Sequence, residues 1–219
     1  MTRIAVLSLT RDRLTYTRHC FGILHDQQGA FDHYVLDQGS EDGTVAWLAG
    51  QDLELTALPE NIGCCRGWNL LIDKHQLRGR YDVVVCFDND CALVRPDTLS
   101  VVAGLAAEQN LILSPRVLGL RYPPPSIGHF DAGEHVVEET TILGNIFMAI
   151  PAHLLNSFRW DERNLPWAGG EAITSWFRST GGRCGYVRGH EAWHYPSTDQ
   201  QHEDYPWYFA RRIAEGAPD

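Results

Sequence analysis

Apolar residues in the first half of the chain fall into short runs that polar or glycine-containing segments separate. Five of these runs have the length and composition of buried strands: residues 4–9, 34–36, 53–58, 81–87 and 111–113. Between them, apolar residues spaced three or four apart predict four helices. The first follows Thr10, its expected cap, and ends before Gly29; two more cover 42–48 and 67–77, and the fourth begins at Pro96. Strands that alternate with helices predict an α/β fold with a mainly parallel central sheet.

The pattern changes after residue 114. Pro123, Pro124 and Pro125 open a polar stretch, which we expect to be a long loop as far as His135. Further on, the sequence predicts a strand over 140–150, a helix over 170–179 and a last strand over 183–187. Beyond Tyr195 the chain has aromatic and charged residues without a clear period.

Length and charge narrow the class of protein. The chain has 219 residues, 44% of them hydrophobic, which is enough for one domain with a buried core. The formal net charge of -10 opposes binding to phosphate backbones, so we expect no nucleic acid as a partner. No apolar run has the length of a bilayer crossing, so we expect no integral membrane segment, which leaves peripheral contact with a membrane open.

The six cysteines do not form a disulfide pattern. None lies in a C-x-x-C pair, and Cys64 and Cys65 are adjacent. Cys86 lies inside the apolar run 81–87 and is expected to be a small buried residue. Reduced thiols predict a cytoplasmic protein.

Two carboxylates one residue apart, Asp88 and Asp90, follow the most strand-like segment of the chain. Ligands of open α/β sheets bind beyond the carboxyl ends of strands. Neighbouring carboxylates repel each other unless a proton or a cation relieves the charge, and hard oxygen ligands suit Mg²⁺ or Mn²⁺. The alternative is a solvated turn that only ends the strand.

Four stretches in the same order resemble the family 2 glycosyltransferases, whose nucleotide-sugar-binding domain has the GT-A fold. They are residues 6–13, 35–44, 61–69 and 87–99. The resemblance implies a three-layer α/β/α sandwich (GT-A, Rossmann-like), formed by a single domain over 1–219. Within it, residues 1–114 would bind the nucleotide-sugar, and 115–219 would form the acceptor side and the C-terminal tail.

The resemblance also implies a donor site and a metal site. The residues expected to bind a nucleoside-diphosphate sugar are Thr10, Arg13, Asp37, Gln38, Asn61, Arg66, Asn69, Asp88 and Asn89. The expected ligands of Mn²⁺ or Mg²⁺ are Asp88, Asp90 and His194, with His190 and His202 as competitors for the last position. Simpler structural functions remain open: an Asx-turn at Asp37, helix caps at Asn61 and Asn69, and a surface charge at Arg66.

The acceptor side carries a candidate catalytic base. In the resembling family an acidic residue at the start of a late helix deprotonates the acceptor hydroxyl, and Glu171 matches this region. Ala172 departs from the pattern, because an aspartate usually stands at that position. Glu171 would then act as the base of an inverting displacement, or it would only complement the positive end of the helix dipole.

The sequence as a whole predicts a metal-dependent glycosyltransferase that moves a sugar from a nucleoside-diphosphate sugar to an acceptor hydroxyl. Two alternatives remain. A nucleotidyltransferase of related fold normally has a glycine-rich turn after the first strand, and residues 8–13 lack glycine. A catalytically inactive nucleotide-sugar-binding module would be consistent with Ala172.

Overall fold

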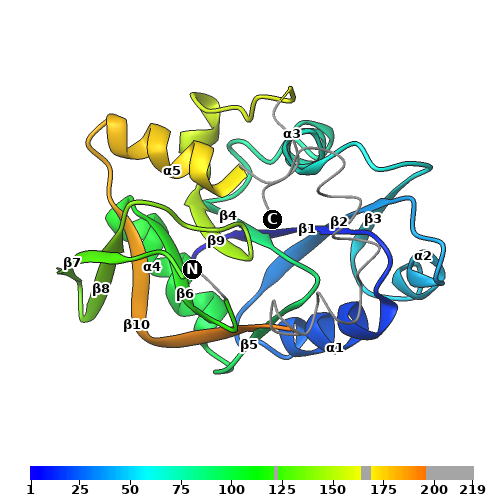
Figure 1. The fold of residues 1–219 in the computed structure, drawn as a ribbon, viewed down its shortest axis with the longest axis horizontal. Helices are drawn as coiled ribbons and strands as arrows, with labels where there is room; N and C mark the ends of the chain where they lie inside the picture. The colour runs from blue at the N-terminus through cyan, green and yellow to red at the C-terminus, as the bar shows by residue number, and fades with distance from the viewer. Residues whose placement is uncertain (121–122, 164–168, 196–219) are drawn as a thin grey trace.

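A mixed ten-stranded sheet organises the chain in the computed structural model, which describes residues 1–120, 123–163 and 169–195 (Figure 1). Its strands are β1 (Ile4–Thr10), β2 (Phe31–Gln38), β3 (Glu54–Leu58), β4 (Val83–Phe87), β5 (Cys91–Leu93), β6 (Ile112–Leu118), β7 (Ser126–Ala132), β8 (His135–Thr140), β9 (Phe147–Pro151) and β10 (Cys184–His194). The helices are α1 (Leu14–His25), α2 (Thr44–Leu48), α3 (Cys64–Lys74), α4 (Thr98–Gln109) and α5 (Gly169–Ser179), with a 3₁₀ helix η1 (Ala152–Asn156).

The strand order is β3-β2-β1-β4-β9-β6-β10-β8-β7, and β5 pairs with β10. The first four strands in this order are parallel to one another. β9 runs antiparallel to both β4 and β6, so it separates the parallel block from the later strands. The carboxyl ends of β1, β2 and β4 therefore meet at one edge of the sheet.

Side-chain alternation along β4 shows how the layers form. Val83, Val85 and Phe87 belong to a core shared with α1 and α4, whereas Val84 and Cys86 belong to a second core shared with α3 and α5. Because both faces of this strand are covered, its sequence is a continuous apolar run instead of an alternating one. The predicted three-layer α/β/α arrangement with parallel central strands is confirmed.

One aspartate joins the starts of two helices beside the sheet edge. Asp42 Oδ2 accepts a hydrogen bond from the backbone N–H of Leu14 at 2.8 Å, and its Oδ1 accepts from the N–H of Thr44 at 3.0 Å. Burial opposes the charged carboxylate, but the bonds from Thr44 and Leu14 lower its pKa below the ordinary value. The expected cap at Thr10 is wrong: α1 begins at Leu14, and the Thr10 hydroxyl bonds Asp37 instead.

The prediction of a long loop that runs as far as His135 is wrong, because this stretch contains β7, which pairs with β8 as an antiparallel hairpin. β7 lies at the end of the sheet, and nearly all its side chains are exposed. An edge strand with little burial has no apolar alternation, so its sequence resembles a loop. The expected strand over 140–150 is also divided: β8 ends at Thr140 and β9 begins at Phe147.

Among the residues that the structure describes, no helix combines the length and the apolar character that a bilayer crossing requires. The aromatic and charged tail beyond Tyr195 lies outside the described residues.

A buried histidine on β2 should make stability depend on pH. Burial and, to a smaller extent, the nearby His25 ring together lower the pKa of His33 to about 3. The unfolded chain takes up this proton near pH 6.5, so the native state loses stability as the pH falls from 6.5 towards 3. Between pH 7.5 and pH 5 this one group should account for about 2 kcal/mol of the loss.

Urea unfolding at the two pH values tests this expectation. His33→Gln should flatten the pH dependence of the free energy of unfolding, while a substitution of the exposed His129 leaves it unchanged. An equal pH dependence in wild type and His33→Gln would show that His33 is not the titrating group.

Candidate active site

The candidate site lies at the edge where the parallel strands end. Thr10, the last residue of β1, is paired with Asp37 near the end of β2. On the other side of β1, Cys86 is paired with Leu7, which places Asp88 just beyond the end of β4. The backbone N–H of Asp88 donates to the carbonyl of Ile146 at 2.9 Å, so the residue before β9 fixes this position.

Asp88 carries an unfavourable negative charge. Burial has the largest effect on the pKa of its carboxyl, the charge of Asp90 acts in the same direction and Arg13 opposes both, and together they raise the pKa to about 7. Within the described part of the chain, the Arg13 guanidinium lowers this pKa but does not return it to the ordinary value. A divalent cation would supply the missing charge.

Asp90 is buried and faces two basic side chains. Arg13 Nη1 lies 3.0 Å from Asp90 Oδ2, and His194 Nε2 lies 3.6 Å from the same oxygen. All three side chains are at most 14% exposed. Arg13 and the preceding Asp12 both have positive φ angles, of 67° and 56°, so a strained turn after β1 directs the guanidinium to this carboxylate.

His194 reaches the site because β10 is longer than the sequence predicts. The expected strand over 183–187 continues past a bulge between Val187 and Glu191, and its end pairs antiparallel with β5 (Figure 1). In that register His194 lies opposite Cys91, the residue after Asp90. A bulge bends and re-aims a strand, which here brings an imidazole from the end of the described chain to Asp90.

The residues present fit a divalent cation in their chemistry. Two carboxylates with a nearby imidazole form a donor set that suits Mn²⁺. The described residues contain no preassembled group of three or more His, Cys, Asp and Glu side chains that could hold a metal. Asp88 and Asp90 would thus supply part of a coordination shell that phosphate oxygens and water complete.

The expected base- and ribose-binding residues make intramolecular contacts. Asp37 is fully buried, and its carboxylate accepts from the Thr10 hydroxyl at 2.9 Å and from both the N–H and the hydroxyl of Ser40, at 3.0 and 2.5 Å. Gln38 Oε1 accepts from the N–H of Ile62 at 3.0 Å. These bonds correspond to the Asx-turn alternative, and they order the edge of the sheet beside the two carboxylates.

Two further residues expected to bind the nucleotide-sugar also form hydrogen bonds within the protein. Asn89 Nδ2 donates to Thr17 Oγ1 on α1 at 2.8 Å, and Asn61 Oδ1 accepts from the N–H of Gly63 at 2.9 Å. The first bond ties the metal motif to α1. The second stabilises the turn that enters α3.

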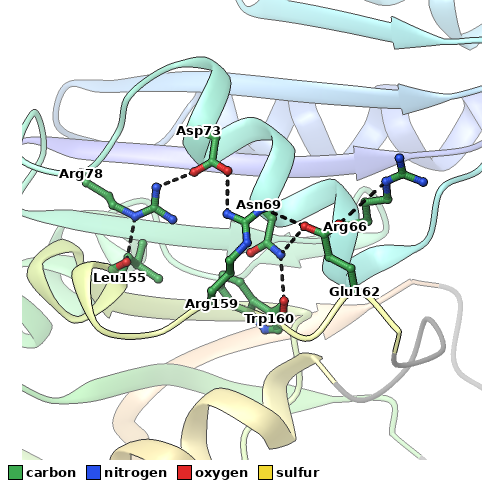
Figure 2. Close-up of polar contacts among 8 residues, drawn as sticks. All are labelled: Arg66, Asn69, Asp73, Arg78, Leu155, Arg159, Trp160 and Glu162. Carbon is green, nitrogen blue, oxygen red and sulfur yellow. Dashed lines mark hydrogen bonds and ion pairs between the residues drawn. The ribbon is translucent and has the colours of Figure 1, made fainter.

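Arg66 and Asn69 face the segment that follows η1 (Figure 2). Arg66 is largely exposed and lies 4.0 Å from Glu162. Asn69 is only 1% exposed, and its amide donates to the Trp160 carbonyl and to Glu162. The sequence analysis did not single out Glu162 for a function, because nothing local marks it as a partner of α3.

Glu171 lies in the first turn of α5 and is exposed. Ala172, in place of the expected aspartate, packs against the core on the α3 side of the sheet. Residues 164–168, which precede α5, lie outside the described residues.

A mixed sheet with a parallel central block, covered by helices on both faces, is the arrangement that this chain shares with solved structures of the GT-A fold. The structure of S. aureus TarS 1–349 in complex with UDP is similar, with a TM-score of 0.63 and 18% identity over 87% of this chain. The mannosyltransferase PcManGT from Pyrobaculum calidifontis, in complex with GDP-Man and Mn²⁺, matches 99% of this chain with a TM-score of 0.66 and 17% identity.

GalNAc-T7 with UDP, GalNAc and Mn²⁺ matches 89% of this chain and 44% of its own, with a TM-score of 0.69 and 11% identity. The chain spans 60% of the TarS fragment and 66% of PcManGT. No protein-family model matches the sequence, and no curated protein matches it. At these identities the similarity establishes the GT-A fold.

Replacing Asp88 and Asp90 by asparagine, one at a time, should change the stability of the protein in opposite directions. The folded-state pKa of Asp88 lies above its ordinary value, so ionisation at pH 8 destabilises the native state, and Asp88→Asn should maintain or raise the metal-free melting temperature. Asp90→Asn breaks a buried pair with Arg13 and should lower the free energy of unfolding by about 3 kcal/mol.

Thermal unfolding with and without Mn²⁺ checks this pair of variants. Wild type should gain stability from Mn²⁺ with a nucleoside diphosphate, and Asp88→Asn should gain none. A metal response in Asp88→Asn equal to that of wild type would remove Asp88 from the metal site.

Proposed function

We propose that this protein is a metal-dependent glycosyltransferase that moves a sugar from a nucleoside-diphosphate sugar to an acceptor hydroxyl with inversion. The observation that carries the proposal is the position of two carboxylates, the half-buried Asp88 and the buried Asp90, at the carboxyl end of β4 in a GT-A fold. The similar structures support the donor class, since TarS binds UDP and UDP-GlcNAc and PcManGT binds GDP-Man with Mn²⁺.

Asp88 and Asp90 would hold Mn²⁺ or Mg²⁺ against the donor diphosphate, with His194 beside them as the third candidate ligand. When bound, the metal neutralises the charge that grows on the departing diphosphate. Arg13 pairs with Asp90 and adds positive charge next to this position. Thr10, Asp37, Gln38, Asn61 and Asn89 form hydrogen bonds that order the segments around it.

Glu171 would accept the proton of the acceptor hydroxyl. It is exposed in the first turn of α5, and its carboxylate has no hydrogen-bond or ion-pair partner among the described residues. Direct attack on the anomeric carbon, with one proton passing to Glu171, inverts the anomeric centre.

Two alternatives remain, and one has a specific observation in its favour. A nucleotidyltransferase has little support, because the turn after β1 lacks glycine and contains the positive-φ residues Asp12 and Arg13. A binding module without catalysis is favoured by Ala172, which removes the usual acidic group from α5. Donor turnover separates this module from an enzyme.

We also infer that the protein acts in the cytoplasm, and the free state of all six cysteines supports this location. A single domain over 1–219, with a donor half up to residue 114, remains our proposal for the organisation of the chain.

A panel of nucleotide sugars tests the donor class. UDP-GlcNAc, UDP-GalNAc, GDP-mannose and their free nucleotides are added with Mn²⁺, and the melting temperature is measured. The true donor, at 100 times its dissociation constant, should add about 2.7 kcal/mol of stability, and this gain should vanish with a chelator. No stabilisation by any nucleotide would contradict the proposed donor site.

Substitution of the candidate base tests the chemistry. Glu171→Gln keeps the size of the side chain but cannot take a proton near neutral pH. Turnover of sugar transfer should fall by on the order of 10²–10⁴-fold, with donor affinity unchanged. Glu108→Gln, which changes an exposed glutamate on α4, is the matched control and should leave turnover unchanged.

Full transfer activity in Glu171→Gln would assign proton transfer to another group. Proton NMR of the new anomeric centre then reads the stereochemistry directly, and a retained configuration would contradict the inverting displacement.

A further inference from the structure

Helix α3 contacts the segment after η1 through a polar network (Figure 2). Asp73 accepts from Arg78 and Arg159 at 2.5 and 2.6 Å, and Glu162 accepts from Arg159 at 2.8 Å. These ion pairs are 30–51% exposed, and pairs of this kind contribute little to stability. The buried contact of the network is the one made by Asn69.

Asn69 is held in one orientation. Its Nδ2 donates to the Trp160 carbonyl at 2.9 Å and to Glu162 Oε1 at 3.0 Å, while its buried Oδ1 has no partner among the described residues. A flipped amide would point Oδ1 at two acceptors, so only the orientation with the NH₂ towards Trp160 and Glu162 is favourable. The side chain therefore joins the donor half of the chain to the backbone of Trp160.

The side chain of Trp160 connects this contact to the start of α5 through a hydrogen bond. The side chain is 2% exposed, and its indole Nε1 donates to the carbonyl of Gly169 at 2.8 Å. Gly169 is the first residue of α5. A buried N–H without a partner is costly, so this bond fixes where the helix begins.

The opposite side of the helix start is equally constrained. A Cβ on Gly170 would lie 2.2 Å from the Leu143 carbonyl oxygen, so the backbone approaches more closely than any other residue allows. Glu171 follows directly. Because its side chain has no partner among the described residues, its place in the site depends on the backbone position of Gly169 and Gly170.

We propose that Asn69 and Trp160 are positioning residues that connect α3 to the start of α5 and thereby place Glu171 against the acceptor hydroxyl. This inference rests on the proposed function. It assigns Asn69 a structural link across the site, whereas the resemblance to known families implies contact with the donor.

Trp160→Phe tests this link, because it keeps an aromatic ring in the core but removes the N–H that donates to Gly169, together with part of the indole volume. Turnover of transfer should fall on the order of 10- to 100-fold, while the donor KM stays at its wild-type value. Trp176→Phe is the matched control. Trp176 lies on α5 with its ring centroid 5.2 Å from that of Phe158, and its indole N–H has no hydrogen-bond partner among the described residues. It should leave turnover unchanged.

A double-mutant cycle separates positioning from general weakening of the fold. In the Glu171→Gln background, Trp160→Phe should cause no further loss of turnover, because the group it positions no longer accepts a proton. Independent losses that multiply in the double variant, or a loss of donor affinity equal to the loss of turnover, would overturn the proposal.

Hydrogen exchange gives a second measurement that needs no activity. Amides in the first two turns of α5 should exchange faster in Trp160→Phe and in Asn69→Ala, and at the wild-type rate in Trp176→Phe. Unchanged exchange in both variants would overturn the connection itself. Wild-type protein without any transfer activity would instead refute the proposed function, while the exchange measurement still reports on the connection.

Discussion

The edge of the sheet is organised around a charge imbalance. Asp88 and Asp90 follow a strand that is buried on both faces, and among the described residues the Arg13 guanidinium forms an ion pair with Asp90. Burying a carboxylate is costly unless a positive group accompanies it, so the surrounding chain is arranged to bring such groups in. The strained turn after β1, the bulge in β10 and the antiparallel β5 all have this result. What the fold leaves uncompensated at Asp88 is the charge that a bound cation would supply.

Much of the first half of the fold could be predicted from the sequence, because its strands are buried on both faces. The run from Val83 to Phe87 is apolar throughout, and its end marks the Asp-x-Asp motif directly. The hairpin of β7 and β8 could not be predicted in this way. Most residues of its outer strand are exposed, and only its end, at Phe130 and Ala132, packs against the core, so the sequence has no clear hydrophobic period.

The candidate site could likewise be predicted from the sequence only in part. Asp88 and Asp90 are adjacent to a strong local pattern, and Glu171 follows a glycine pair whose close packing explains why no larger residue stands there. Asn69 shows the limit of such reasoning. Its sequence context suggests a polar residue at a ligand, but a segment far along the chain buries it and occupies its amide. Long-range contacts of this kind leave no local signal in the sequence.

The pairing of β10 with β5 has a consequence for how the protein folds. β5 directly follows the metal motif, while β10 ends the described part of the chain, so the two pair across nearly half of the sequence. Contacts between distant segments form late, because closing a long loop costs entropy before any pairing repays it. The core around β1, β2 and β4 lies within the first 90 residues, so these strands can pair while the chain is still being synthesised. His194 joins only when synthesis has passed the last strand, so an interrupted chain would carry both carboxylates and lack the imidazole beside them.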